Sequence, residues 1–325
     1  MNITTKYVLS CFIGASLAAN ASLALAQDDF PSRPITLIIP WAAGGTSDMI
    51  GRALAKAAGE HLGQQIIVVN RSGASTQIGI AAVTQAKPDG YTIGTLSSST
   101  YALQAQGQKL PFDVNDSLSY ISYIGDNTVG IAVRADSPYK TLKELLDAAR
   151  AKPEELRFGT AGPGSTPHLL IESLSDAARA KFTHVPYQGS AATMPALLGG
   201  FVDFVCDVSS WAPFVRDGRV RLLAVAAPRR IEEYSSVPTL TELGYPQVRN
   251  IQAVIGPKGI PGPIRDKLEV AFRKALQGQE FQSSMQRLSM TIVDMPGEQV
   301  ANLVRKETAD MTILYKRINL QATNR

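Results

Sequence analysis

Cysteine is almost absent from this chain of 325 residues, which contains only Cys11 and Cys206. Cys11 lies in an apolar N-terminal stretch that we expect to be removed, so the mature chain keeps one thiol and forms no intramolecular disulfide. Cys206 lies among Phe204, Val205 and Val208, a pattern typical of a buried strand. We therefore interpret Cys206 as a packed side chain and not as a nucleophile.

Motifs of the common enzyme classes are also missing. The sequence contains no G-x-S-x-G, C-x-x-C, H-E-x-x-H or G-x-x-x-x-G-K-[ST] pattern, which argues against the usual hydrolase, redox, zinc and nucleotide sites. His61 falls in an expected surface helix and His184 in an expected strand, with no nucleophile spaced for either. These observations predict a protein that is not an enzyme and holds no metal or cofactor.

The chain also has no large excess of positive or negative charge. The 32 Lys and Arg residues face 28 Asp and Glu residues, and the basic ones are spread along the chain rather than clustered. We therefore expect no nucleic-acid partner. No second long apolar run follows the N-terminal one, so we expect no membrane span in the mature chain.

The N-terminal segment 1–26 has the features of a secretory signal peptide. Lys6 is its only charged residue, most of the rest is apolar, and Ala24-Leu25-Ala26 forms an A-x-A cleavage site. Polar residues interrupt the apolar part and no basic flank follows it, which disfavours the alternative of a membrane anchor. Lipidation at Cys11 stays a minor alternative. Cleavage after Ala26 predicts export to the periplasm.

The mature chain, residues 27–325, is longer than one hydrophobic core usually supports, so we expect two domains. Short apolar runs alternate with helical patterns, which predicts an α/β fold in which helices cover mainly parallel sheets. The expected strands are 35–39, 66–69, 91–96, 120–124, 129–133, 156–159, 182–186, 202–207, 221–226 and 251–255. The expected helices are 48–62, 77–85, 141–151, 263–276 and 298–318, with two more between the strands of the second lobe. Residues 97–116 are expected to be irregular.

Two crossings are expected to divide the chain into lobes. The first lies near Gly125-Asp126-Asn127 and the second near residues 248–252. Lobe 1 then consists of residues 27–126 and 250–325, and lobe 2 of residues 127–249. One domain interrupted by another, with two crossings, is the arrangement of hinged binding proteins. Two capping-box patterns, which begin at Thr141 and Thr239, are typical of helix starts.

Two segments, 40–48 and 159–168, place glycines and hydroxyls between the end of a strand and the start of a helix. Glycine lets the backbone approach a ligand closely. The free N–H groups of a first helical turn, at the positive end of the helix dipole, form an anion site. Neither segment contains Lys or Arg, so a carboxylate there would be held by amides and hydroxyls. The alternative, ordinary turn and cap chemistry, stays open at this point.

Three polar residues near these segments allow two interpretations each. Asp48 falls in a first helical turn, where a carboxylate stabilises the helix by about 0.3–1 kcal/mol with or without a ligand, and we favour that structural role. His168 either donates to the ligand or caps its own loop. Asp207 follows an expected buried strand and either recognises an amine or hydroxyl of the ligand or has a turn or cap role.

Several motifs along the chain are shared with a known family. The first lobe carries Pro-Trp-Ala-Ala-Gly-Gly-Thr-Ser-Asp at 40–48, Val-Asn-Arg-Ser-Gly-Ala at 69–74 and Lys-Pro-Asp-Gly-Tyr-Thr at 87–92. The second lobe carries Phe-Gly-Thr-Ala-Gly at 158–162, Ser-Thr-Pro-His at 165–168, Val-Pro-Tyr-Gln-Gly-Ser at 185–190 and Leu-Gly-Gly-Phe-Val-Asp at 198–203. In this order, and over essentially the whole mature chain, they resemble the tripartite tricarboxylate transporter receptor family, also called Bug proteins.

The resemblance implies a type II-like, two-lobed periplasmic-binding-protein fold with a ligand cleft between the lobes. It implies a receptor that closes on a small carboxylate, whether aromatic, di- or tricarboxylate, or amino acid. Such a receptor delivers its ligand to the large and small subunits of a membrane permease, and we expect it to be a monomer. A periplasmic sensor that signals to a membrane kinase is the alternative that the sequence leaves open.

The family pattern places the ligand carboxylate on the loop after the first strand and on the glycine and hydroxyl loop of the second lobe. We predict ligand contacts from Trp41, Ala43, Gly44, Thr46, Ser47, Asp48, Ser98, Gly162, Ser165, Thr166, His168, Tyr187, Gly189, Ser190 and Asp207. Two departures from the family pattern stand out. Ser72 replaces the usual proline and should not touch the ligand, while Gln188-Gly189-Ser190 replaces lysine-glycine-glycine and bears on specificity.

Overall fold

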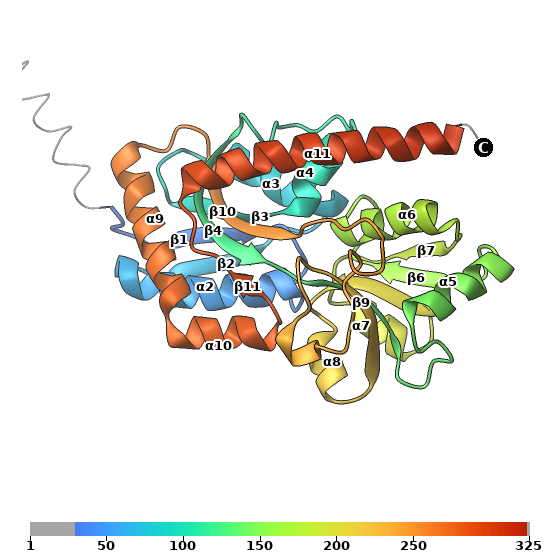
Figure 1. Cartoon of the computed structure of the whole chain (residues 1–325). Coiled ribbons are helices and arrows are strands. Elements are labelled where there is room, and N and C mark those ends of the chain that lie inside the picture. Colours follow the sequence, from blue (N-terminus) through green and yellow to red (C-terminus); the bar gives the residue numbers. More distant parts are fainter. Residues whose placement is uncertain (1–29, 324–325) are drawn as a thin grey trace, which may run out of the picture.

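The computed structural model describes residues 30–323, so the predicted signal peptide lies outside the described residues. Two sheets form the centres of two lobes, and helices surround both (Figure 1). This arrangement confirms the predicted α/β class and the two-lobed fold. The described helices are α2 (Thr46–Leu62), α3 (Gln77–Thr84), α4 (Ser98–Ala105), α5 (Leu142–Ala151), α6 (Thr166–Ala178), α7 (Thr193–Leu198), α8 (Ala212–Arg216), α9 (Gly262–Gln277), α10 (Gln279–Arg287) and α11 (Gly297–Thr323).

The first sheet combines strands from both ends of the described chain. They are β1 (Ile35–Ile39), β2 (Ile66–Asn70), β3 (Thr92–Ser97), β4 (Leu118–Asp126), β10 (Ile251–Pro257) and β11 (Thr291–Ile292). Their order is β11-β4-β10-β3-β1-β2. β1 pairs in parallel with β2 and β3, whereas β10 runs antiparallel to both β3 and β4.

The second sheet is made of one continuous part of the chain. Its strands are β5 (Val129–Arg134), β6 (Arg157–Thr160), β7 (Thr183–Pro186), β8 (Phe204–Val208) and β9 (Val220–Ala226). Their order is β7-β6-β8-β5-β9. β6 pairs in parallel with β7 and β8, and β5 runs antiparallel to β8 and β9.

These pairings correct the expectation of a mainly parallel sheet in each lobe, because both sheets are mixed. Three strands run against the others: β5 and β10, which follow the crossings between the lobes, and the short edge strand β11, which is antiparallel to β4. The strands β1, β6 and β8 end near the cleft, so each runs toward it. A strand that enters its lobe from a crossing must run the opposite way, and β5 and β10 therefore oppose their neighbours.

The side chains of β1 show why helices cover both faces of the first sheet. Ile35 and Leu37 belong to the core that contains Leu54 of α2, whereas Ile38 packs in the core that contains Ile80 of α3. Successive side chains of a strand point to opposite faces. A strand that is apolar on both faces therefore needs a helical layer on each side.

Several local features differ from the sequence predictions, among them the short helix α8 and the strand β11, neither of which was expected. α4 occupies the start of the stretch 97–116 that was expected to be irregular, and α10 follows α9 where no helix was expected. α4 begins with serines and threonine, which are poor helix formers, and it is held instead by burial of nearly all its residues. The capping box at Thr239 makes its two reciprocal bonds with Glu242 (2.8 and 3.1 Å), but in a turn and not at a helix start.

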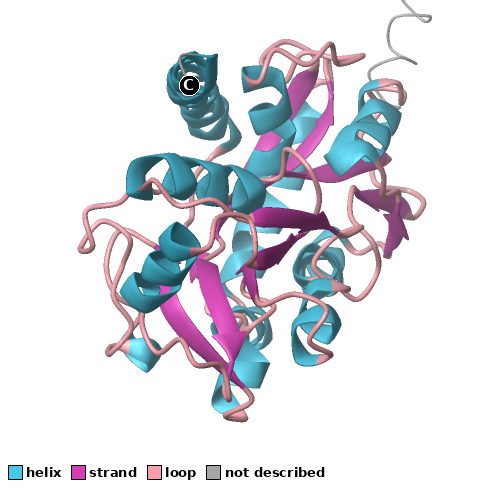
Figure 2. Cartoon of the chain, turned by 90° about the vertical axis from the view of Figure 1, so that its right-hand side faces the viewer, coloured by secondary structure: helices cyan, strands magenta, loops and turns pink. Residues whose placement is uncertain are grey.

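The two crossings are bonded to each other. Asn127 N donates to Asn250 O (2.8 Å), and Asn127 Nδ2 donates to Asn250 Oδ1 (3.0 Å). Beside them, the Arg249 guanidinium donates to both carboxylate oxygens of Asp126 (2.6 and 2.9 Å). α11 packs against α4 and β4 of the first lobe and also reaches α6 of the second. Figure 1 shows this helix along the top of the molecule, and Figure 2 shows it nearly end-on.

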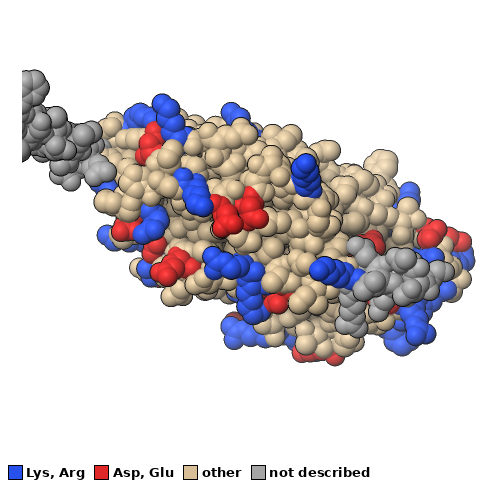
Figure 3. Space-filling view, turned by 90° about the horizontal axis from the view of Figure 1, so that it is seen from above, with Lys and Arg blue, Asp and Glu red and all other residues tan. Residues whose placement is uncertain are grey.

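Within residues 30–323, no helix combines the length and the apolar character needed to cross a bilayer. On the face seen in Figure 3, basic and acidic side chains are dispersed among neutral ones. That face therefore carries no broad patch of a single sign. This distribution agrees with the spread of charge along the sequence.

Candidate functional site

A small cavity lies between the two lobes. Its volume is about 20 Å³, room for about one water molecule. Residues of both lobes line it: Trp41, Ala42, Gly45, Thr46, Ser47, Ser97, Ser99, Ala161, Pro167, Ser190, Val208, Asn250 and Gln252. No lysine or arginine is among these lining residues.

Three helix N-termini converge on this cavity. α2 begins after Gly45, α4 after Ser97 and α6 after Ser165. Neither Gly45 nor Ser97 makes a side-chain capping bond to its helix. The first N–H groups of a helix have no intrahelical partner and form the positive end of its dipole. At α6 these groups are already used, because Thr166 N donates to Ser99 Oγ, His168 N donates to Ser165 Oγ, and Pro167 has no N–H. The uncapped N-termini of α2 and α4 can hold an anion without a cationic side chain.

Direct hydrogen bonds join the lobes around the cavity. Thr46 Oγ1 donates to Val208 O (2.7 Å), and Ser75 Oγ donates to Pro163 O (2.7 Å). Each bond connects the first lobe to the second. The structure is therefore a closed form, in which the lobes have met over the cavity.

The predicted contacts in the first loop fall into two groups. Trp41, Thr46 and Ser47 line the cavity. Ala43 and Gly44 are exposed at the outer side of the loop and are not among the lining residues. The indole of Trp41 donates to Ser97 Oγ (3.3 Å), which keeps the ring beside the N-terminus of α4.

Asp48 is engaged inside the first lobe. It is 4% exposed and accepts hydrogen bonds from Gly44 N (2.9 Å), Arg52 Nε (3.0 Å) and Asn70 Nδ2 (2.8 Å). Burial alone would raise its pKa, but the bonds from Arg52, Gly44 and Asn70 outweigh burial and hold the pKa below its usual value. These contacts favour the structural interpretation, in which Asp48 ties the loop to α2 and β2.

In the second-lobe loop, the predicted hydroxyls are used within the protein. Ser165 caps α6: its Oγ donates to Gly162 O (2.7 Å) and accepts from His168 N (3.4 Å). Thr166 is buried, and its N–H donates to Ser99 Oγ of the first lobe (3.2 Å). The loop therefore serves α6 and the closed contact between the lobes.

Gly162 and Tyr187 line a wider hollow of about 240 Å³ next to the cavity. Trp41 borders both spaces. Gly189 N donates to Ala161 O (3.2 Å), and a Cβ at Gly189 would lie 3.7 Å from the Trp41 ring. Gly189 therefore keeps the second-lobe loop close to the indole.

His168 packs behind the loop and is not among the residues that line the cavity. Its Nδ1 accepts from Gly164 N (3.1 Å), and its ring stacks on His184 with centroids 4.2 Å apart. Burial, and then the charge of His184, lower the pKa of His168 to about 4. These contacts favour the interpretation that His168 caps its own loop.

Two further predicted contacts are buried behind the cavity. Ser98 Oγ accepts from Ile251 N (2.7 Å) and from the Tyr101 hydroxyl (2.7 Å), which ties α4 to β10. Asp207 accepts a hydrogen bond from Ser190 Oγ (2.6 Å). Ser190 lines the cavity, whereas Ser98 and Asp207 do not.

Sequence analysis did not name Ser97, Ser99, Asn250 or Gln252, all of which line the cavity. Ser97 and Ser99 lie where a buried strand passes into a helix, so the signal that identified the first loop could have found them. Asn250 and Gln252 lie at the second crossing, where polar side chains beside an apolar strand were the available signal.

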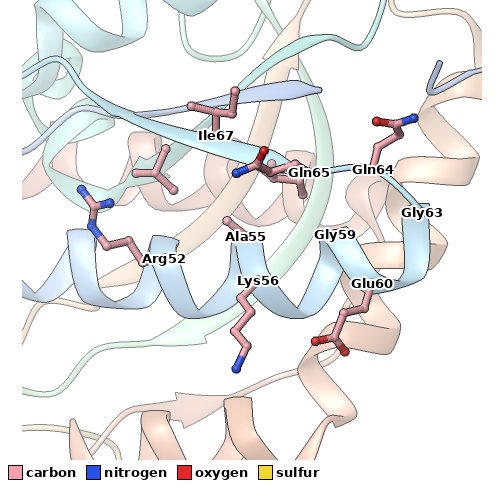
Figure 4. A pocket seen from close by; sticks show the side chains of 11 residues that line it. Arg52, Ala55, Lys56, Gly59, Glu60, Gly63, Gln64, Gln65 and Ile67 are labelled. Carbon is pink, nitrogen blue, oxygen red and sulfur yellow. The ribbon is translucent and has the colours of Figure 1, made fainter. Parts of the chain in front are cut away.

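A larger hollow of about 800 Å³ lies on the outer side of the first lobe, between α2 and the edge strand β2 (Figure 4). In Figure 4, Arg52 and Lys56 project from α2, and the exposed Ile67 lies on β2. Both cations are paired, Lys56 Nζ with Glu280 Oε1 (2.6 Å) and Arg52 with Asp48 (3.0 Å). We therefore do not assign the anion site to this hollow.

Within the described part of the chain, no group of three or more His, Cys, Asp or Glu side chains is arranged to hold a metal ion. Cys206 is a free, buried thiol, as its sequence neighbours predict. Burial, and then the charge of Asp207, raise the pKa of Cys206 well above its usual value. This thiol therefore stays protonated and packed.

Comparison with known proteins identifies the family. A family model described as the tripartite tricarboxylate transporter family receptor matches residues 50–320. A protein of Cupriavidus necator, named UPF0065 protein in gbd 5'region, is 37% identical over 304 residues, which cover 90% of this chain and 93% of that protein.

Two solved structures share the fold. The periplasmic binding protein BugD has a TM-score of 0.85 at 28% identity, covering 89% of this chain and 99% of that chain. MatC from Rhodopseudomonas palustris, with bound malate, has a TM-score of 0.82 at 28% identity, covering 88% of this chain and 100% of that chain. These findings confirm the resemblance seen in the motifs. The chain belongs to the tripartite tricarboxylate transporter receptor family, a family of solute-binding receptors.

Proposed function

We propose that this chain is a periplasmic receptor that captures a small carboxylate between its lobes and delivers it to the membrane subunits of a tripartite permease. One observation carries the proposal: the N-termini of α2 and α4, neither of them capped by a side chain, meet at an inter-lobe cavity whose lining contains no lysine or arginine. Oriented amides favour an anion there. The malate bound to MatC, a structural relative, supports a carboxylate as the ligand class.

The composition of the cavity supports binding without catalysis. Its lining consists of hydroxyls, amides, an indole and small apolar groups, and it includes no histidine, carboxylate or thiol. A serine acts as a nucleophile only when an adjacent base takes its proton. The one lining serine with a carboxylate beside it is Ser190, and that carboxylate, Asp207, is already held by Val208 N and Ser210 Oγ. The ligand is therefore released unchanged.

Capture requires the lobes to move. A cavity of about 20 Å³ is too small for a carboxylate of several carbon atoms. The bonds from Thr46 to Val208 and from Ser75 to Pro163 must open for entry and form again when the lobes close on the ligand. Rigid-body rotation about the two crossings is the motion that hinged receptors use.

Mass spectrometry of the ligand that co-purifies, followed by calorimetry with the same carboxylate, tests the proposal. A ligand at one hundred times its dissociation constant stabilises the folded protein by about 2.7 kcal/mol, so its melting temperature rises. Ser47→Ala removes a hydroxyl from the cavity lining and should weaken binding, while Ser284→Ala, on the exposed side of α10, should not. The proposal fails if no carboxylate binds, or if the recovered ligand is chemically altered.

A further inference from the structure

Asp207 lies in β8 with its side chain fully buried (0% exposed). Its Oδ1 accepts from Ser190 Oγ (2.6 Å) and Val208 N (2.7 Å). Its Oδ2 accepts from Ser210 Oγ (2.8 Å) and lies against Thr193 Oγ1, whose single hydrogen is shared between Oδ2 and Ser190 O (2.9 Å). None of these four partners is a cation. A carboxylate has about four lone-pair sites, so Asp207 keeps none for direct contact with a ligand.

The bond to Asp207 fixes the direction of the Ser190 hydroxyl. A serine hydroxyl has one hydrogen. Asp207 Oδ1 also accepts from Val208 N and so acts as an acceptor, and the hydrogen of Ser190 is committed to it. Ser190 lines the inter-lobe cavity, whereas Asp207 does not. The Ser190 oxygen therefore faces a ligand with lone pairs alone and can only accept.

Thr46 also presents only an acceptor to the cavity. It lines the cavity, and its Oγ1 donates its single hydrogen to the Val208 carbonyl (2.7 Å). Gly45, which precedes Thr46, is so close to the second lobe that a Cβ there would lie 3.9 Å from the Ser190 Cβ. Thr46 and Ser190 together form an acceptor wall of the cavity.

Ser47 and Ser97, in contrast, can act as hydrogen-bond donors toward the cavity. Ser47 Oγ accepts from Gln252 Nε2 (3.1 Å), and Ser97 Oγ accepts from Trp41 Nε1 (3.3 Å). Each hydroxyl therefore keeps its own hydrogen to donate. Beside the N-termini of α2 and α4, Ser47 and Ser97 form a donor wall, which suits the oxygens of a carboxylate.

We propose that the ligand is a small carboxylate that also carries a hydrogen-bond donor, a hydroxyl or an ammonium group, and that this donor lies against Ser190. Asp207 is the positioning residue that makes Ser190 an acceptor. This inference rests on the proposed function and narrows its substrate class. A carboxylate without the donor leaves the oxygens of Ser190 and Thr46 unpaired in a closed cleft, and unpaired buried acceptors weaken binding.

Calorimetry with matched ligands tests the inference. L-malate, L-aspartate and succinate share one carbon skeleton and differ at one position by a hydroxyl, an ammonium group or hydrogen, and L-lactate, L-alanine and propionate form a smaller set. In the set that fits, the hydroxy or amino acid should bind at least about tenfold more tightly than the unsubstituted acid, a difference of about 1.4 kcal/mol. The tighter of the two substituted acids identifies the donor as hydroxyl or ammonium.

The same data separate the two proposals. Equal affinity for substituted and unsubstituted acids overturns the inference and leaves the carboxylate receptor intact. Binding of no member of either set overturns the inference, whereas the proposed function fails only if no carboxylate of any kind binds or co-purifies.

Three variants test the role of Ser190 and Asp207 through the ratio of affinities within a set. Ser190→Ala should bring the ratio close to one. Asp207→Asn offers an amide N–H to Ser190, which frees the hydroxyl hydrogen and should lower or reverse the ratio. Ser210→Ala removes another donor to Asp207, outside the cavity lining, and should keep the ratio.

A merely structural role for these residues would weaken all ligands together and leave the ratio unchanged. A native ratio in a folded Ser190→Ala variant therefore overturns the inference. The ratio measured for Ser190→Ala tests the inference even if the Asp207→Asn variant does not fold.

Discussion

Asn127 and Asn250, 123 positions apart in the chain, are joined by a main-chain hydrogen bond of 2.8 Å and a side-chain hydrogen bond of 3.0 Å. One residue belongs to each crossing between the lobes. Because both bonds connect the crossings and not the facing surfaces of the cleft, the lobes can separate without breaking them. The pair therefore joins the two crossing segments into a single hinge.

Asn127→Ala should destabilise the protein. The substitution leaves the buried Asn250 Oδ1 without its donor, which costs about 1–3 kcal/mol in the free energy of unfolding. Urea unfolding measures the loss. The exposed Asn302→Ala is the matched control and should change stability by less than about 0.5 kcal/mol. Equal stability of the two variants would show that the side-chain bond contributes nothing to the hinge.

Thr46→Val should favour the open form. It removes a bond to Val208 O that exists only when the lobes are closed, and such a bond contributes about 0.5–1.5 kcal/mol. Ligand affinity should fall about two- to tenfold, and small-angle scattering of the ligand-free protein should give a larger radius of gyration. Thr312→Val removes a bond within α11 and serves as the control. An unchanged radius and affinity for Thr46→Val would contradict the assigned closing contact.

Ligand affinity should depend only weakly on salt. Amides and hydroxyls in a closed cleft are screened little by ions, because screening acts mainly on exposed and separated charges. Arg216 is already engaged by Glu233 (2.5 and 2.8 Å) and by Arg287 O (2.6 Å), so it is not free to pair with a ligand. A calorimetric salt series measures the dependence. A steep loss that Arg71→Gln abolishes would replace the helix-terminus mechanism with an ion pair.

The contribution of His168 to the free energy of unfolding should fall between about pH 6.5 and pH 4. The pKa of His168 is about 4 in the folded protein and 6.5 without the fold, so the unfolded chain binds more protons between these values. The stabilisation that comes from keeping His168 uncharged in the folded protein is fully present above pH 6.5, and it is lost as the pH falls to about 4. Its size is about 3 kcal/mol, from 1.36 kcal/mol per pKa unit.

Urea unfolding of His168→Asn at several pH values checks this window. An asparagine oxygen can still accept the Gly164 N–H, and the dependence on pH should shrink. Part of it should remain, because burial also lowers the pKa of the stacked His184. His61→Asn, on the exposed side of α2, should keep the full dependence. A native pH profile for His168→Asn would show that another group controls acid stability.

Much of the fold and of the first-lobe site is encoded locally, and the sequence alone determines it. Trp41, Thr46 and Ser47, three of the predicted ligand contacts, line the cavity together, because a strand end, a glycine turn and a helix start are neighbours along the chain. The capping box from Thr141 to Glu144 forms for the same reason. The motifs also suffice to indicate the family, since their order covers both lobes.

Only the tertiary structure decides how the polar groups of the cavity are used. Ser165 resembles a ligand donor in sequence, yet its hydroxyl caps α6. Asp207 resembles a ligand contact, yet its oxygens are filled by four donors, one of them Ser190. Whether a hydroxyl donates or accepts depends on the group that folding places beside it, and that group often lies far away in the chain. Sequence patterns show which polar groups are present, and packing determines which of their hydrogens and lone pairs remain for a ligand.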